Sequence, residues 1–322
     1  MWRQFFLLPL FLPLSGLSQN KMPAKINIDK AAYKILKAGI KPDFLTIDGE
    51  AVWVINDHQS KVIKLELSRD TPSLVVAVPE ACTAPVIGFN ALWVMSCTEK
   101  RLYKIDKNTG VILAKIATGM ADEKGEMSLA IAAGSVWLLS DSIGILLRID
   151  PVTNTIKNRI IVEPNSYCAA ASGKAIWVSN FKNNSIQKID TKTNKVVGTI
   201  AVGKQPRFIA ATNRWVFTLN QGDGTVTKID AVNGKVVASI NVHAIGGGGD
   251  IDAYGQRVWV KSTNPDLPLQ TINISTNKIE TIYEEVYNDS KPIKVDGAVR
   301  VSKKYIWVTG YFNNVVWILK NK

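Results

Sequence analysis

A short apolar pattern centred on tryptophan recurs along the whole chain. It is usually spelled VWV or IWV, and the intervals between its copies are 40, 44, 40, 38, 44 and 48 residues. The seven tryptophans are Trp53, Trp93, Trp137, Trp177, Trp215, Trp259 and Trp307. A repeat of about 40 residues is the length of one blade of a β-propeller.

Each repeat unit contains four short predicted strands, labelled a to d in chain order. In residues 204–242 these are KQPRFIAATN, RWVFTLN, GTVTKID and KVVASINV, and strands b and c alternate apolar and polar residues as half-buried strands do. The c–d turn begins with Asp and ends with Gly or Asn, as in KIDKNTG and KIDAVNG. The Asp carboxylate can accept hydrogen bonds from turn amides, and Gly or Asn tolerates a positive φ. No segment shows helical periodicity.

The two ends of the sequence predict how the ring of blades closes. The unit around Trp307 ends after its strand c, whereas residues 33–38 form a strand d that precedes the first unit. We therefore expect an all-β, seven-bladed β-propeller of four-stranded antiparallel blades, with the N-terminal strand completing blade 7. This arrangement removes an open sheet edge that would promote aggregation. The tryptophans are expected to fill the gaps between blades rather than to stack on a ligand.

The first eighteen residues have the pattern of a signal peptide. Arg3 supplies the positive charge, residues 5–14 are almost wholly apolar, and Gly16 and Ser18 precede a predicted cut before Gln19. The apolar run is shorter than the roughly 20 residues that span a bilayer, so cleavage is expected rather than anchoring. No later segment is predicted to cross a membrane. The sequence thus predicts a secreted or periplasmic protein, with a signal peptide at 1–18, a lead-in linker at 19–30 and the propeller at 31–322.

Export to an oxidising compartment would permit a disulfide between two of the three cysteines. A two-residue turn pairs Gly88 with Ala91, and counting outward along the two strands brings Cys82 opposite Cys97. Opposed residues have Cβ atoms about 4.5–5.5 Å apart, close to disulfide range. We expect a Cys82–Cys97 disulfide and a small buried thiol at Cys168, because no histidine near Cys168 in the sequence supports a nucleophilic role.

The formal charge of the chain is +12, from 39 Lys and Arg against 27 Asp and Glu. The lysines are spread along the sequence and form no block, so the charge predicts solubility and a weak attraction for polyanions. Basic residues interleaved with aromatic residues along one strand, as a nucleic-acid stacking groove requires, are missing.

The repeat units resemble those of YVTN-type propellers and of streptogramin (virginiamycin B) lyase-like propellers. The most similar stretch is IWVSNFKNNSIQKIDTKTNKVVGTIAVGKQP, and weaker copies cover nearly the whole chain. The resemblance implies the fold, but these repeats host enzymes as well as scaffolds. Streptogramin lyases use a divalent metal with a His and a Glu near the channel mouth. This chain offers His58 and His243 as catalytic candidates, although no lyase motif can be matched around them.

In a propeller, the d–a and b–c loops surround the mouth of the central channel, where ligand sites usually form. The residues expected there from the d–a loops are Asp43, Thr83, Glu126, Tyr167, Gln205, Arg207, Asp250, Asp252 and Asp296. Those expected from the b–c loops are Asp57, His58, Asp141, Asn180, Phe181, Asn220, Gln221, Tyr311 and Phe312. We take as binding candidates Asp43, Asp57, Glu126, Tyr167, Arg207, Asp250, Asp252, Asp296 and Tyr311.

A GGGGD run at residues 246–250 lies among these loops. Four glycines can let backbone amides approach an anion, but no GK[ST] or G-x-G-x-x-G pattern follows the run. We therefore interpret it as a flexible d–a loop that fits a crowded channel mouth.

Together these features favour a monomeric, non-enzymatic binding or scaffold propeller outside the cytoplasm. Its partner would be an unidentified protein or small molecule at the channel mouth, with no cofactor. The alternative is a divalent-metal-dependent lyase of the streptogramin lyase type, and the second alternative is a propeller that binds polyanions or nucleic acid.

Overall fold

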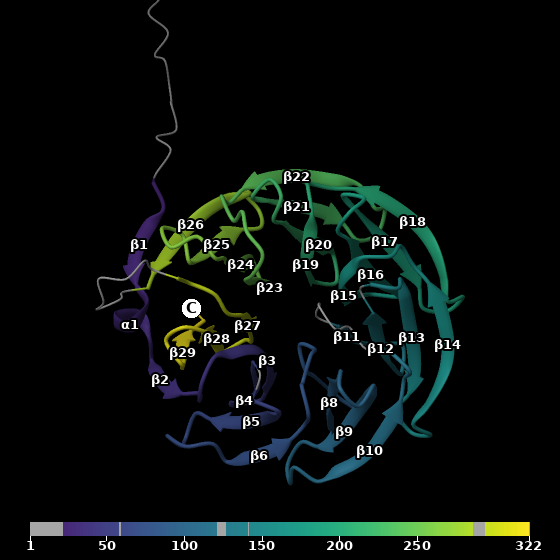
Figure 1. Cartoon of the computed structure of the whole chain (residues 1–322). Helices are drawn as coiled ribbons and strands as arrows, with labels where there is room; N and C mark the ends of the chain where they lie inside the picture. The colour runs from purple at the N-terminus through teal and green to yellow at the C-terminus, as the bar shows by residue number, and fades with distance from the viewer. Residues whose placement is uncertain (1–21, 58, 121–126, 141, 286–293, 322) are drawn as a thin grey trace, which may run out of the picture.

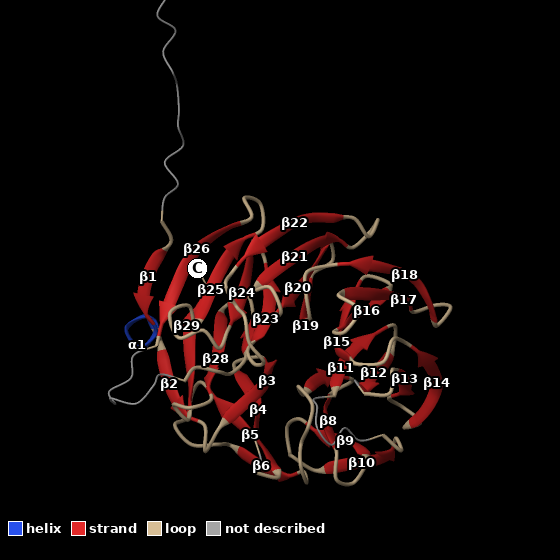
Figure 2. Cartoon of the chain, turned by 45° about the horizontal axis from the view of Figure 1, so that its top comes forward, coloured by secondary structure: helices blue, strands red, loops and turns tan. Residues whose placement is uncertain are grey.

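Seven antiparallel blades surround a common centre, as Figure 1 shows. The structure is a computed structural model, and it describes residues 22–57, 59–120, 127–140, 142–285 and 294–321. Within these residues every blade has four antiparallel strands, with strand a innermost and strand d outermost, and one further strand from the N-terminal part of the chain joins the sheet of blade 6 (Figure 2). The predicted all-β, seven-bladed propeller is confirmed.

Each blade takes its strands in sequence order, except that blade 7 borrows its strand d from the N-terminal part of the chain. Blades 1 to 3 are formed by β3 (Pro42–Asp48), β4 (Ala51–Asn56), β5 (Lys61–Glu66) and β6 (Leu74–Ala77); by β7 (Val86–Gly88), β8 (Ala91–Ser96), β9 (Arg101–Asp106) and β10 (Ile112–Ala117); and by β11 (Ser128–Ala132), β12 (Ser135–Ser140), β13 (Ile145–Asp150) and β14 (Thr155–Ile161). Blades 4 and 5 are formed by β15 (Ser166–Ser172), β16 (Ala175–Asn180), β17 (Ser185–Asp190) and β18 (Lys195–Ala201), and by β19 (Pro206–Ala211), β20 (Trp215–Asn220), β21 (Thr225–Asp230) and β22 (Val236–Asn241). Blades 6 and 7 are formed by β23 (Asp250–Tyr254), β24 (Arg257–Lys261), β25 (Leu269–Asn273) and β26 (Lys278–Glu284), and by β27 (Val299–Val301), β28 (Tyr305–Gly310), β29 (Val315–Lys320) and β2 (Lys34–Lys37).

The core of the protein lies between the blades. Every residue of strand b is buried in blades 1 to 4, because this strand is covered on both faces by neighbouring sheets. Strand d, at the rim, instead alternates exposed and partly buried residues, as β18 does. The predicted packing role of the tryptophans holds at Trp53, Trp93, Trp137, Trp177, Trp259 and Trp307, which are all buried.

Blade 5 departs from this rule. In the other blades the tryptophan is the third residue of strand b, but in β20 Trp215 pairs with Asp230, at the end of strand c, and is only partly buried. Phe217, which pairs with Lys228 and is fully buried, occupies the position that Trp53 and its counterparts fill elsewhere. The prediction that Trp215 is one of the equivalent packing residues is therefore wrong by two positions.

In each of blades 1 to 5, a Lys or Arg side chain on strand c contacts the next blade. We call this contact the cation staple. In blade 4, Lys188 Nζ lies 5.1 Å from the centre of the Trp177 ring and donates a 2.8 Å hydrogen bond to Ala231 O, in the c–d turn of blade 5. The staple joins the aromatic ring of one blade to a backbone carbonyl of the next blade. The other four staples run from Lys64 to Lys107 O, Lys104 to Pro151 O, Arg148 to Thr191 O and Lys228 to Ile274 O.

The N-terminal strand closes the ring as predicted. β2 pairs antiparallel with β29, with Lys34 opposite Ile318, and Lys34 Nζ also donates a 2.9 Å hydrogen bond to Leu67 O of blade 1. The segment expected to be a lead-in linker is more structured than that. Its β1 (Ala24–Asn27) pairs in parallel with β26, and α1 (Ile28–Ala31) follows at once and places Ile28 in the core (Figure 1).

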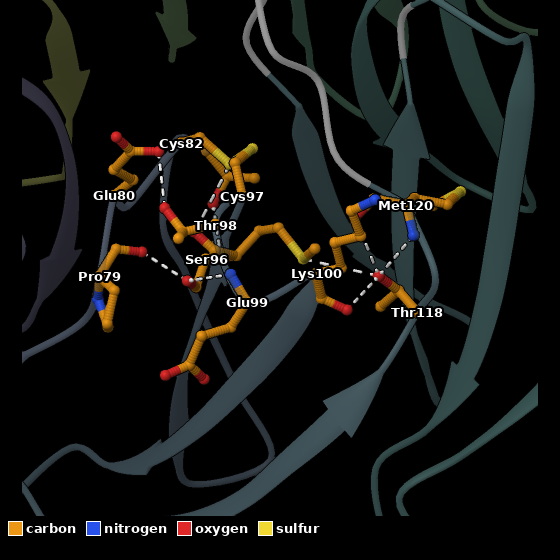
Figure 3. Close-up of a disulfide and its surroundings, with 12 residues drawn as sticks. Pro79, Glu80, Cys82, Ser96, Cys97, Thr98, Glu99, Lys100, Thr118 and Met120 are labelled. Atoms are coloured by element: carbon orange, nitrogen blue, oxygen red, sulfur yellow. Dashed lines mark hydrogen bonds between the residues drawn. A yellow bond between two sulfur atoms is a disulfide. The ribbon is translucent and has the colours of Figure 1, made fainter.

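The predicted Cys82–Cys97 disulfide is present, with a Cα–Cα distance of 5.9 Å (Figure 3). The two cysteines are not directly opposite each other, however. Strand pairing shifts by two residues between Val86, which pairs with Trp93, and Ala81, which pairs with Ser96. The chain bulges between these pairs because the side chain of buried Thr83 takes over a backbone hydrogen bond, accepting from Met95 N at 3.1 Å.

The predicted signal peptide, residues 1–18, lies outside the described residues. Within the described part of the chain, no helix is both long and apolar enough to cross a membrane.

Candidate functional site

A cavity of about 230 Å³ lies at the centre of the ring, and strand a or the residues beside it contribute to its lining from all seven blades. We call it the channel chamber. Phe44 from blade 1 and Phe208 from blade 5 meet with ring centres 6.0 Å apart, and both are buried. Because blades 1 and 5 are not neighbours, these rings meet across the channel and form an apolar wall of the chamber.

The polar wall of the chamber is a charged cluster at the seam of blades 6 and 7. Asp250 is buried and forms an ion pair with Arg300, whose side chain is 25% exposed. Asp250 Oδ2 also accepts from Val299 N at 3.2 Å, and Asp252 Oδ2 accepts from Val301 N at 2.7 Å. Both carboxylates thus cap the inner edge of β27, whose amides have no further strand to pair with.

Burial sets the protonation of this cluster. Desolvation raises the pKa of Asp252 to about 6, against an ordinary value of 3.8, although Arg300 acts in the opposite direction. Desolvation also raises the pKa of Asp250. For Arg300 burial alone would lower the pKa, but the two carboxylates outweigh it and raise the pKa. The Asp252 carboxyl of this cluster therefore gains a proton as the pH falls through about 6.

Cys168 also lines the chamber. Its thiol lies 4.0 Å from Ile209 O and 3.9 Å from Ser128 Oγ, and burial raises the pKa of the thiol to about 11. A neutral thiol is a poor nucleophile, which agrees with the expectation of no nucleophilic role, although Cys168 is only partly buried rather than buried.

A second group of predicted residues meets around Tyr311, after β28. The Tyr311 hydroxyl donates to Asp57 Oδ2. Desolvation, this hydrogen bond and the charges of Asp57, Asp43 and Asp296 together raise the pKa of Tyr311 well above its usual value. Lys41 Nζ lies 5.5 Å from the centre of the Tyr311 ring and offsets part of the negative charge. Four of the predicted binding residues therefore do come together.

Arg207 lies beside Tyr167 and next to Gly247 of the glycine run. Its guanidinium stacks on Tyr167, with 4.5 Å from Cζ to the ring centre, and its Nε is buried without a hydrogen-bond partner in the described part of the chain. Tyr167 in turn packs on Phe181 with ring centres 5.1 Å apart and lines the chamber. Arg207 is thus a cation held over an aromatic platform beside the chamber.

The glycine run docks on a side chain of the protein itself. Gly249 N donates to Asp296 Oδ1 at 2.8 Å, and a Cβ at Gly248 would collide with the same carboxylate. Gly249 has a φ of +94°, and a Cβ there would collide with Lys261 O. The run therefore serves close packing at the channel mouth, as the crowded-loop interpretation requires.

Several predicted residues do not join either group. His243 is exposed, has a φ of +51° and lies beside the b–c turn of blade 5, next to Gly224. Asn180, Asn220, Gln221 and Thr83 are buried and hydrogen-bonded within the fold. His58, Glu126 and Asp141 lie outside the described residues. Among the residues that are described, no three His, Cys, Asp or Glu side chains come together in a group that could hold a metal ion.

Sequence reasoning placed Asp250 and Asp252 in a loop, whereas they begin strand a of blade 6 and face the chamber. It missed Arg300, Phe44 and Phe208 altogether. The sequence contained a hint of Arg300, since it is the one charged residue of the short apolar strand VRV. No sequence pattern indicates that the two phenylalanines meet, because their contact depends on the radius of the propeller.

Comparisons with known proteins agree with the fold. No protein-family model and no curated protein sequence matches the chain. Among solved structures, virginiamycin B lyase from Staphylococcus aureus aligns with a TM-score of 0.72 and 14% identity, over 90% of this chain and 99% of the lyase. A streptogramin B lyase aligns with a TM-score of 0.73 and 13% identity, over 89% and 98%. The Pan2 WD40 domain of Neurospora crassa gives 0.68 and 10% identity, over 88% and 90%. At such low identity the similarity is one of fold, and at that level the expected resemblance to streptogramin lyases is confirmed.

Proposed function

We propose that this chain is a non-enzymatic binding propeller that acts outside the cytoplasm and holds a small molecule in the channel chamber. The observation that carries the proposal is the cluster of Asp250, Asp252 and Arg300, which lines the same chamber as the buried pair Phe44 and Phe208. Such a combination of an apolar body and a few fixed polar groups is typical of small-molecule sites.

The charge of the cluster suggests the class of ligand. The cluster contains two carboxyl groups and one guanidinium, so a ligand with a protonated amine would favour the ionised form of both carboxyls and balance the second negative charge. The apolar part of that ligand would contact Phe44, Phe208 and Tyr167. A volume of about 230 Å³ suits a single ring with a short side chain.

The test compares three probes of the same size, benzylammonium, benzoate and benzyl alcohol, by saturation-transfer NMR at pH 7.5. We expect benzylammonium to bind and the other two to bind at least about tenfold more weakly. Asp252→Asn should weaken benzylammonium binding, while Asp266→Asn, an exposed carboxylate on the b–c loop of the same blade, should not. Equal binding of all three probes, or no effect of Asp252→Asn, would contradict the proposal.

Two observations support a place outside the cytoplasm. One is the signal-peptide pattern of residues 1–18, and the other is the Cys82–Cys97 disulfide, since such bonds persist in oxidising compartments. Expression with the native leader, followed by mass spectrometry, should find a chain that starts at Gln19. A full-length chain retained in the cytoplasm would contradict this part of the proposal.

The similarity of fold to virginiamycin B lyase favours one other candidate function, a metal-dependent lyase. Incubation of the protein with virginiamycin B and Mg²⁺, followed by mass spectrometry, separates the two. Conversion of the antibiotic that stops with a chelator and with His58→Ala or His243→Ala would establish the lyase function. Unchanged antibiotic, together with benzylammonium binding, would support the binding function.

A further inference from the structure

A second cavity, of about 520 Å³, lies between blades 6 and 7 and shares no lining residue with the channel chamber. Its walls come from β24 to β26 on one side and from β29 on the other. The segment from Ile26 to Tyr33, with α1, covers it. Figure 1 shows this region where β1 and α1 lie beside β26 and β29. We call it the seam cavity.

The cation staple is missing at blade 6, and the seam cavity is lined by the two residues at its position. In blades 1 to 4 a Lys or Arg stands opposite the blade tryptophan and lies over its ring. In blade 6 the residue opposite Trp259 is Thr271, which is too short to reach the next blade. The space that a lysine side chain fills elsewhere is therefore open, and both Trp259 and Thr271 line it.

Aromatic rings supply the flat surfaces of the seam cavity. Trp259 stacks on Tyr283 with ring centres 5.6 Å apart and an interplanar angle of 29°, and Tyr33 lies on the opposite side. The indole Nε1 of Trp259 is buried and has no hydrogen-bond partner in the described part of the chain. A ring that enters the cavity would thus meet an aromatic platform with an unused donor.

The polar side chains of the lining favour an anion. Among the described residues that line the cavity, three are basic, Lys30, Arg257 and Lys320, and none is acidic. Lys320 Nζ is held 4.4 Å from the centre of the Tyr33 ring, and Arg257 Nε lies 3.1 Å from Glu280, so one of the three charges is already balanced. The remaining positive charge would repel a ligand cation, even though the place of the missing lysine is free.

We propose that the seam cavity is a second binding site, and that it takes a flat aromatic carboxylate. The ring would lie on Trp259 and Tyr283, and the carboxylate would face Lys320 and Lys30. A sugar acid fits less well, because its hydroxyl groups need acceptors and the lining that the structure describes contains no carboxylate. This site is independent of the function proposed for the channel chamber.

The probe for the test is 2-naphthoate, with 2-naphthylmethylammonium and glucuronate as matched comparisons, in titrations followed by the fluorescence of the protein. We expect 2-naphthoate to bind and each comparison compound to bind at least about tenfold more weakly. Tighter binding of the ammonium compound or of glucuronate, or no binding of 2-naphthoate, would overturn the proposal.

Thr271→Lys locates the site, because it restores the basic side chain that five other blades carry at this position of strand c, as lysine in four of them and arginine in one. The new lysine should fill the cavity and reduce 2-naphthoate affinity by at least about tenfold. Thr199→Lys is the control, since it adds the same charge at an exposed position of β18. Lys320→Ala, at an exposed end of β29, serves as a second variant in case Thr271→Lys does not fold, and it should reduce the affinity about fivefold. Full affinity in either site variant would overturn the proposal.

Discussion

Replacing Asp252 by Asn should change how the stability of the protein depends on pH. The folded state raises the pKa of Asp252 to about 6 from 3.8, so between these values the folded state holds a proton that the unfolded chain has released. The stabilisation from this proton is fully present below pH 3.8 and is lost as the pH rises through about 6. Wild-type protein should therefore lose stability relative to Asp252→Asn as the pH rises.

The size of the effect follows from the pKa difference. At about 1.36 kcal/mol for each pKa unit the full loss is ~3 kcal/mol, of which ~2 kcal/mol falls between pH 4.5 and pH 7.5. Solvent in the chamber screens part of this, so we expect a measured change of ~1–2 kcal/mol. The amide side chain of the Asp252→Asn variant has only one oxygen, so either Ala253 N or Val301 N loses its hydrogen-bond acceptor. The free-energy cost of this loss is the same at both pH values and cancels in the comparison.

The assay is urea unfolding of the two proteins at pH 4.5 and 7.5, at constant ionic strength. The quantity of interest is the difference in unfolding free energy between wild type and variant, compared across the two pH values. Asp266→Asn, which removes an exposed carboxylate, should leave this difference unchanged. If the wild type instead gains stability relative to Asp252→Asn at the higher pH, or if the difference is the same at both, the burial argument for the charged cluster is refuted.

Three further predictions concern the staples, the thiols and the charge of the surface. Lys188→Met should keep the apolar contact with Trp177 but lose the hydrogen bond to Ala231, and should lower the unfolding free energy in urea by ~1–2 kcal/mol; no loss would mean that the staple contributes packing alone. Replacing Cys82 and Cys97 by Ser should lower the unfolding free energy by ~3 kcal/mol, the value for a disulfide that closes a loop of about 15 residues, and a change near zero would show that the disulfide does not constrain the unfolded chain. Binding of the protein to a heparin column should be weak and should vanish at moderate salt, because its lysines are spread out; retention at high salt would favour the polyanion function.

The architecture could be predicted from the sequence because each blade repeats the same local signals. The interval between tryptophans gave the number of blades, and the unpaired strand at residues 33–38 gave the closure of the ring. The exception in blade 5 shows the limit of this reasoning. Trp215 matched the motif but not the register, and only the pairing of Phe217 with Lys228 identifies the residue that fills the gap between the blades.

The candidate site was predicted only in part. Asp43, Asp57, Asp296 and Tyr311 were expected near one another, because loops on one face of a propeller must converge. The cluster at the chamber was not foreseen, because its members Asp250 and Arg300 lie fifty residues apart and meet only when neighbouring inner strands come together. Long-range meetings of this kind depend on the curvature of the ring, which no local pattern in the sequence records.

Closure of the ring by β2 also determines the order in which the protein can fold. Lys34 is among the first residues of the propeller to be synthesised, and its partner Ile318 is among the last. The apolar faces of β2 and β29 therefore stay unpaired until both strands have been synthesised. Pairings of such long range form slowly and are prone to aggregation. We therefore expect β2 to dock on β29 late in folding, and a block at either end of the chain should leave the ring open.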